Sequence, residues 1–248
     1  MATNQFNLLK GYKFAKNYIV EAGFGDEIEW QKNLHFEDIK ESDFLRESAW
    51  VILCAGMKES VIRKYFRDIT FCFFEWESAE KIVKMKKYCV EYALDIFNNL
   101  RKINAIAETA QQVFDIGFNK LKTILQDKSI ETLLSFPFMG PVTSYHLAKN
   151  LGIPVAKADR HLVRLASSLG YTNVQEFCAD ISKESKEPIS VVDIVLWRFA
   201  TLKRDYICKF LLVSSQTKGH RLIKRELDLS AGNKSQKGRS PSTETAGG

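Results

Sequence analysis

One acid, Asp159, stands among basic residues in the stretch "AKADRHLVR". Lys157 precedes it by two positions, Arg160 follows it directly, and Arg164 lies about one helical turn further on. The pattern predicts a helix that begins near Ala158, with Asp159 in its first turn. A fixed carboxylate there can stabilise a developing positive charge or orient an attacking water, and the cations around it can hold phosphates. An aspartate at a helix start is also a common N-cap, worth about 1 kcal/mol without any chemistry.

A tight turn between two helices precedes this acid. "SIETLLSFPFMGPVTSYHLAKN" predicts a short helix with Ser129 as N-cap, a turn around Gly140, and a second helix from Pro141 to about Asn150. The free amides of the second helix's first turn, together with the helix dipole, form an anion site. A nucleic-acid phosphate is a natural ligand for such a site. An ordinary helical corner that binds nothing would have the same pattern.

Together the two segments resemble the helix-hairpin-helix DNA glycosylase superfamily, the group of endonuclease III and 3-methyladenine glycosylase II. "ESAWVILCAGMKESVIRKYF" is similar to the early helix pair of that family, and the resemblance extends over roughly residues 43–202. The positions that match its two motifs are Pro137 and Gly140 in the hairpin, and Asp159, His161 and Arg164 in the segment that follows.

The resemblance implies an enzyme that flips a damaged or modified base out of double-stranded DNA and hydrolyses its N-glycosidic bond. Asp159 matches the catalytic aspartate of the family. We expect a monomer. The residues expected to contact the DNA backbone are Phe138, Met139, Gly140, Val142, Thr143, Lys149, Lys157, Arg160 and Arg164.

The chain also departs from the family pattern. Some relatives carry a lysine two residues after the last hairpin glycine, which attacks the sugar as a Schiff-base nucleophile; here that position is Val142. The first hairpin glycine is replaced by Phe138. We therefore expect a monofunctional glycosylase that uses water. A bifunctional glycosylase/lyase that uses Lys157 and a non-catalytic hairpin protein stay open as alternatives.

A base pocket needs aromatic walls and a few polar groups. Trp30 lies in the polar stretch "DEIEWQKN", where a core role is hard to assign, and the neighbouring Gln31 can read a base edge. Tyr145 is a candidate wall. Met57 follows Gly56, which stands where many relatives have a glutamine that fills the gap left by the flipped base. Core packing is the competing interpretation for Met57 and Tyr145.

No cofactor is expected. The cysteines are scattered without a CxxC pair, as in reduced proteins of the cytosol, and only Cys208 lies where some relatives hold a four-cysteine iron–sulfur cluster. His146 and His161 have no nearby third ligand for zinc, so no metal site is predicted. A monovalent cation at the hairpin is compatible with the resemblance.

The fold class is expected to be all-α, because apolar residues recur at three- and four-residue spacing almost throughout. The one strand-like run is "ITFCFFEW". The resemblance implies two helical lobes with DNA in a cleft between them. One lobe would combine residues 1–40 and 158–215, and the other would be residues 41–157 with the hairpin at 129–151. Residues 230–248 have almost no large apolar side chains and should be disordered.

Charge and hydropathy restrict the location. The formal net charge is +6, and the segment from Lys218 onward carries most of it, so a nucleic-acid surface on the folded part must be a local patch. The N-terminus lacks the apolar stretch of a signal peptide, and the longest apolar run, "AWVILCAGM", is too short to span a bilayer. We expect a cytoplasmic protein associated with the nucleoid.

Overall fold

The computed structural model describes residues 6–215, and within them every regular element is a helix, apart from one isolated bridge between Phe6 and Ser215. This confirms the all-α prediction. The α-helices are α1 Leu8–Glu21, α2 Gly25–Lys32, α3 Glu41–Cys54, α4 Glu59–Cys72, α5 Ala79–Lys84, α6 Lys86–Ile96, α7 Leu100–Ile116, α8 Phe118–Leu134, α9 Thr143–Asn150, α10 Arg160–Ser168, α11 Val174–Ser185, α12 Ile189–Leu202 and α13 Tyr206–Ser214, with 3-10 turns at Phe36–Asp38 and Phe74–Trp76. The predicted tail at 230–248 lies outside the described residues.

Several helices begin at a side chain that accepts a hydrogen bond from an early backbone amide. Asn7, Ser78, Asn99, Asp159 and Asn173 each cap a helix in this way. Such caps satisfy amides that have no partner within the helix. The starts of these five helices are therefore encoded by local sequence.

The strand-like run "ITFCFFEW" is helical. It forms the end of α4 and the 3-10 turn after it, where Phe74, Glu75 and Trp76 all have positive φ. The indole of Trp76 lies buried against the ring of Phe73, with ring centroids 5.2 Å apart. Burial of these aromatic side chains stabilises a backbone conformation that such residues rarely adopt.

Three positions interrupt longer runs of helical sequence pattern. Apolar residues recur at helical spacing from residue 79 to 100, but the run is split at Met85 into α5 and α6. Gly117, with φ of 82°, separates α7 from α8. The helix expected to start at Ser129 follows a kink within α8: Lys128 has a non-helical φ of −134° and ψ of 57°, and the helix continues after it to Leu134.

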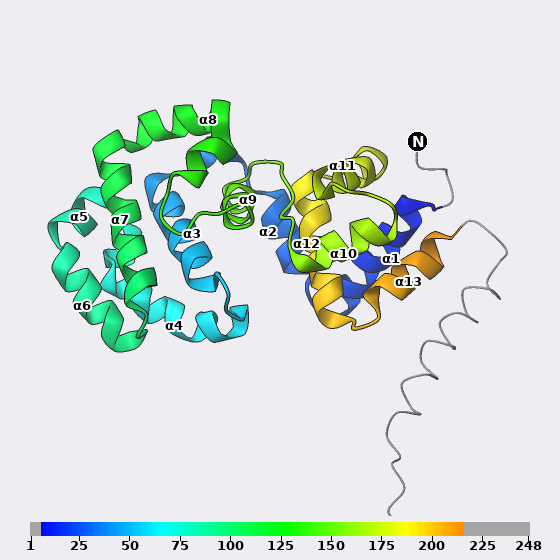
Figure 1. Ribbon diagram of the computed structural model, residues 1–248, viewed down its shortest axis with the longest axis horizontal. Coiled ribbons are helices and arrows are strands. Elements are labelled where there is room, and N and C mark those ends of the chain that lie inside the picture. The colour runs from blue at the N-terminus through cyan, green and yellow to red at the C-terminus, as the bar shows by residue number, and fades with distance from the viewer. Residues whose placement is uncertain (1–5, 216–248) are drawn as a thin grey trace, which may run out of the picture.

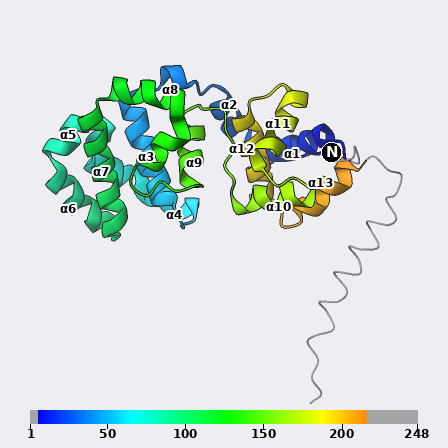
Figure 2. The ribbon, with the colours of Figure 1, turned by 45° about the horizontal axis from the view of Figure 1, so that its top comes forward.

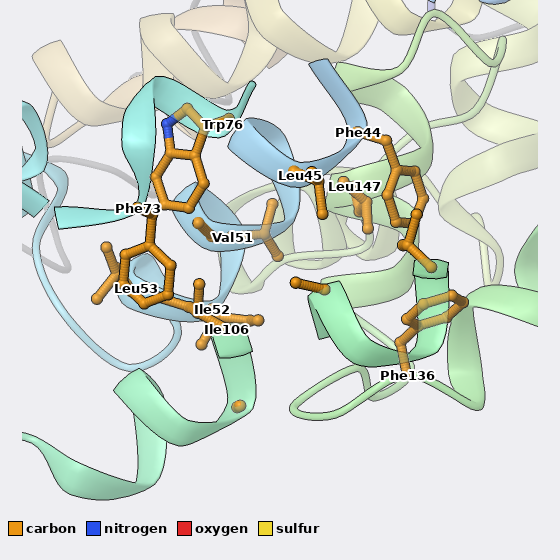
Figure 3. Close-up of a cluster of buried hydrophobic side chains, with 14 of the residues drawn as sticks. Phe44, Leu45, Val51, Ile52, Leu53, Phe73, Trp76, Ile106, Phe136 and Leu147 are labelled. Atoms are coloured by element: carbon orange, nitrogen blue, oxygen red, sulfur yellow. The ribbon is translucent and has the colours of Figure 1, made fainter. Parts of the chain in front are cut away.

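The helices form two groups (Figures 1 and 2). Each group encloses its own cluster of buried hydrophobic side chains. The first cluster comprises buried residues of α3–α9, and the second comprises those of α1, α2 and α10–α13. Figure 3 shows part of the first cluster, in which Phe44 of α3 packs edge-on to Phe136 at 5.5 Å. The chain crosses earlier than the expected boundary at residue 40, because Phe36 and Ile39 already belong to the first cluster.

Polar side chains join the two clusters. Lys149 of α9 forms a buried ion pair with Asp193 of α12, with Nζ and Oδ2 2.5 Å apart. Gln31 of α2 donates from Nε2 to the carbonyl of Lys149. Arg198 of α12 lies 3.7 Å from Glu59 at the start of α4. The relative position of the clusters therefore depends on charged and amide groups as well as on apolar contact.

Gly152 marks a close approach of two backbones where the chain leaves the first cluster. Its φ is 83°, and a Cβ at this position would lie 2.8 Å from the backbone nitrogen of Phe36. Gly170 has nearly the same φ, 84°, but a Cβ there would meet nothing within 4 Å.

These two glycines give a matched test. Gly170→Ala should lower the free energy of unfolding by about 1–2 kcal/mol, the cost of a left-handed backbone for alanine. Gly152→Ala should cost about 1–3 kcal/mol more, because backbone atoms must also move. Urea unfolding of both variants measures the difference. Equal losses would show that the backbone around Phe36 yields without cost.

Candidate active site

Asp159 lies at the end of an extended link, residues 152–158, that joins the two clusters. Two buried or partly buried side chains hold this link. Gln175 of α11 pairs with both backbone groups of Ala156: Oε1 accepts from the amide at 3.0 Å, and Nε2 donates to the carbonyl. Asp193 Oδ1 accepts from the amide of Lys157 at 2.7 Å. The backbone immediately before Asp159 is thus fixed although it is not helical.

Asp159 is the N-cap of α10. Its Oδ1 accepts from the amides of His161 at 2.8 Å and Leu162 at 3.0 Å. Its Oδ2 has no hydrogen-bond partner among residues 6–215, and the side chain is partly exposed. One oxygen therefore orients the carboxylate, and the other is available to a ligand.

Lys157 does not extend into solvent as the prediction of a phosphate contact requires. Its ammonium group is partly buried, and Nζ lies 3.4 Å from Nδ1 of His146 on α9. Burial, followed by the charge of Lys149, lowers the pKa of Lys157, while Asp159 acts in the opposite direction. Burial and the two lysines also hold the pKa of His146 well below its usual value, so this imidazole is uncharged at neutral pH.

Two predicted surface residues are buried. Lys149 is only 4% exposed and is neutralised by Asp193, so it is not free to bind a DNA phosphate. Gln31 is 1% exposed and bonds to the carbonyl of Lys149, so it does not line an open base pocket. Both residues were predicted to lie at the surface because their side chains are polar, and both predictions are wrong. Each side chain has a buried partner from a distant helix, which offsets the free-energy cost of burying a polar group.

Two backbone amides of the hairpin donate hydrogen bonds within the hairpin itself. The amide of Met139 donates to the carbonyl of Phe136, and the amide of Gly140 donates to Thr143 Oγ1 at 2.6 Å. The Met139 side chain is buried. These groups are therefore not available to DNA in this conformation. The amides of Val142 and Thr143 have no acceptor within the described part of the chain, and they are the donors that remain for an anion.

Phe138 occupies a backbone conformation that favours glycine, with φ of 62°. Its ring packs against the first cluster, and the guanidinium carbon of Arg101 lies 5.8 Å from the ring centroid. The aromatic side chain is therefore used within the protein. This explains how a phenylalanine is accommodated where the family pattern has a glycine.

The remaining backbone candidates are on the surface of α10. Arg160 and Arg164 are exposed one turn apart, next to Asp159. His161 points the other way: its ring lies edge-on to Tyr206 at 5.8 Å, and Nδ1 is buried without a partner among the described residues. The Nε of Arg160 donates to Nε2 of His161 at 3.4 Å. The structure therefore brings together a carboxylate and two exposed guanidinium groups at the start of one helix.

No hydrogen bond, ion pair or ring contact joins the other base-pocket candidates within residues 6–215. Trp30 is 43% exposed on α2, and Met57 is 37% exposed in the loop after α3. Tyr145 is partly buried on α9. Lys102, a buried residue of α7, donates to the carbonyls of Leu53 and Ala55 and so fixes the end of α3 that leads to Met57.

The sequence contained a signal for one residue that the predictions missed. Asp193 is the only acid in the otherwise apolar run "ISVVDIVLW", and an acid in a buried helix requires a buried partner. Gln175 and His146 had no comparable signal. Their roles depend on contacts with residues 11 to 19 positions away along the chain.

No group of three or more histidine, cysteine or acidic residues that could hold a metal occurs in the described part of the chain, and no helix there is long and apolar enough to cross a membrane. Searches against protein-family models, curated proteins and solved structures gave no match.

Proposed function

We propose that this protein is a DNA glycosylase that removes a damaged or modified base from double-stranded DNA by hydrolysing its N-glycosidic bond. The observation that carries the proposal is the Asp159 carboxylate, which has one oxygen fixed by the α10 amides and the other uncommitted. The fixed oxygen sets the orientation of the group, and a carboxylate held in this way needs little reorganisation during reaction.

In the proposed reaction the target nucleotide is flipped out of the duplex, and the bond between C1′ and the base breaks. Positive charge then develops on the deoxyribose, where the Asp159 carboxylate stabilises it. Asp159 also orients the water that adds to C1′, leaving an abasic site. Arg160, Arg164 and the free amides of Val142 and Thr143 would hold phosphates on either side of this sugar.

The resemblance to helix-hairpin-helix glycosylases supports this assignment, and it also favours a monomer that acts on the nucleoid in the cytoplasm. Hydrolysis by water, rather than attack by a hairpin lysine, follows from the valine at position 142. The phosphate contacts are electrostatic, so duplex affinity should fall steeply as salt rises.

The direct test uses labelled duplexes that each carry one alkylated, oxidised, deaminated or hypermodified base. After incubation with the protein, each duplex is analysed with and without hot alkali, which cleaves the strand at abasic sites. Excision should give strand breaks that depend on the protein. Binding to duplexes without excision of any base would instead identify a non-catalytic DNA-binding protein.

A further inference from the structure

The two groups of helices are connected by two chain segments, and these segments touch each other. The first group comprises α3–α9 and the second comprises α1, α2 and α10–α13, with α2, α9 and α12 at the junction (Figures 1 and 2). A Cβ on Gly152, in one segment, would lie within 3.1 Å of backbone atoms of residues 34–36, in the other. Both covalent connections therefore pass through one place, as the strands of a hinge do.

Buried polar contacts lie beside this crossing. Lys149, three residues before Gly152, is paired with Asp193 of α12, and the two side chains are only 5% and 2% exposed. Gln31, three residues before the crossing on the other segment, donates to the carbonyl of Lys149 at 3.1 Å. Separation of the groups here would leave buried charges without a partner, which is strongly unfavourable. This part of the junction should therefore stay closed.

A second ion pair across the junction has the opposite character. Nη2 of Arg198 on α12 lies 3.7 Å from Oε2 of Glu59 at the start of α4. This distance is longer than a hydrogen bond, and the Glu59 side chain is 27% exposed. Dissolved ions screen such a contact much more than they screen a buried pair.

Both partners of this pair have closer contacts within their own group of helices. Arg198 donates to both carboxylate oxygens of Glu27, with Nε and Oε2 2.8 Å apart, and its guanidinium carbon lies 4.5 Å from the ring centroid of Phe24. Oε1 of Glu59 accepts from Nε of Arg63 at 2.8 Å. Loss of the contact across the junction therefore leaves neither charge unpaired, and its cost in free energy is small.

We propose that Glu59 and Arg198 form a latch between the two groups of helices. When the latch opens, the groups separate at this point by rotation about the crossing of Gly152 with residues 34–36, while the Lys149–Asp193 pair stays intact. Salt, or a polyanion that competes for Arg198, opens the latch. The use of this movement to admit a DNA strand between the groups rests on the proposed function, whereas the movement itself does not.

The test measures the distance between the groups without DNA. Spin labels are attached through unnatural amino acids at two exposed positions, Lys64 of α4 and Ser167 of α10, so that the native cysteines stay in place. Double electron–electron resonance then gives the distribution of distances between the labels. The Debye length falls from about 10 Å to about 3 Å between 0.1 M and 1 M salt. Over this range the distribution should become broader, with a longer mean distance.

Glu59→Gln removes the charge of the latch, so the labelled variant should have the broad distribution already at about 0.1 M salt. Glu80→Gln is the matched control. It makes the same substitution at an exposed acid that pairs with Lys84 inside the first group, and it should leave the distribution and its salt response unchanged. Glu59→Asp keeps an acid at the start of α4 but withdraws the carboxylate by one methylene, and it should also open the latch.

Circular dichroism on each variant checks that the helices remain. A distribution that does not respond to salt in the labelled parent would overturn the latch, as would unchanged distributions in both Glu59 variants. Base excision plays no part in these measurements. Failure of the latch would therefore leave the proposed glycosylase standing, and absence of excision would leave the latch standing.

Discussion

Asp159→Asn should lower the single-turnover rate of base excision by about 10²–10⁴-fold, the range typical for loss of an essential charge-stabilising or proton-transferring group. The fold should remain intact. Asparagine is as good an N-cap as aspartate, and its Oδ1 can still accept from the amides of His161 and Leu162. The substitution thus removes the charge and retains the cap.

Asp159→Ala removes both the catalytic charge and the N-cap of α10. It should lose the same activity and, in addition, about 1 kcal/mol of stability because the α10 amides lose their acceptor. Excision assays and urea unfolding on both variants make the comparison. Full activity in Asp159→Asn would mean that Asp159 only caps the helix and that the proposed mechanism is wrong.

The buried ion pair between Lys149 and Asp193 should give the largest stability effects. Asp193→Asn keeps an oxygen for the amide of Lys157 but leaves the Lys149 ammonium buried without a counter-charge. Lys149→Met leaves the Asp193 carboxylate in the same condition. Each single change should lower the free energy of unfolding by about 3–5 kcal/mol.

The double variant Lys149→Met/Asp193→Asn has neither charge and should recover much of that stability. The reason is that one unpaired buried charge destabilises the fold by more than the intact ion pair stabilises it. Urea unfolding of the four proteins gives the coupling energy. Lys87→Met, in an exposed pair with Glu91, is the control and should have little effect. Strictly additive losses would show that the two side chains do not interact as described.

Local patterns in the sequence predicted the helices well. The N-cap at Asp159 and the break at Gly117 follow from the residues themselves and their immediate neighbours. Capping and backbone conformation involve contacts over two to four residues, and such contacts are visible in a linear sequence. The aromatic run "ITFCFFEW" has no clear helical or strand period, so its pattern alone does not predict the helical structure that it adopts.

The site was less predictable, because its arrangement depends on long-range partners. Lys149 meets Asp193 across 44 residues, and Gln31 meets Lys149 across 118. Both are polar side chains on short helices, so residue type alone placed them at the surface. The burial of Lys157 likewise depends on α9, which no local pattern connects to the link.

The anchoring of the link has a further consequence. A glutamine that bonds to both the amide and the carbonyl of one residue replaces the neighbouring strand that an extended segment would have in a sheet. Since Gln175 and Asp193 both belong to helices of the second cluster, Lys157 and Asp159 are attached to that cluster, whereas the hairpin is attached to the first. In the proposed function, the hairpin binds a phosphate and Asp159 faces the reacting sugar. The Lys149–Asp193 pair, which joins the two clusters, would therefore fix the distance between these two contacts along the DNA.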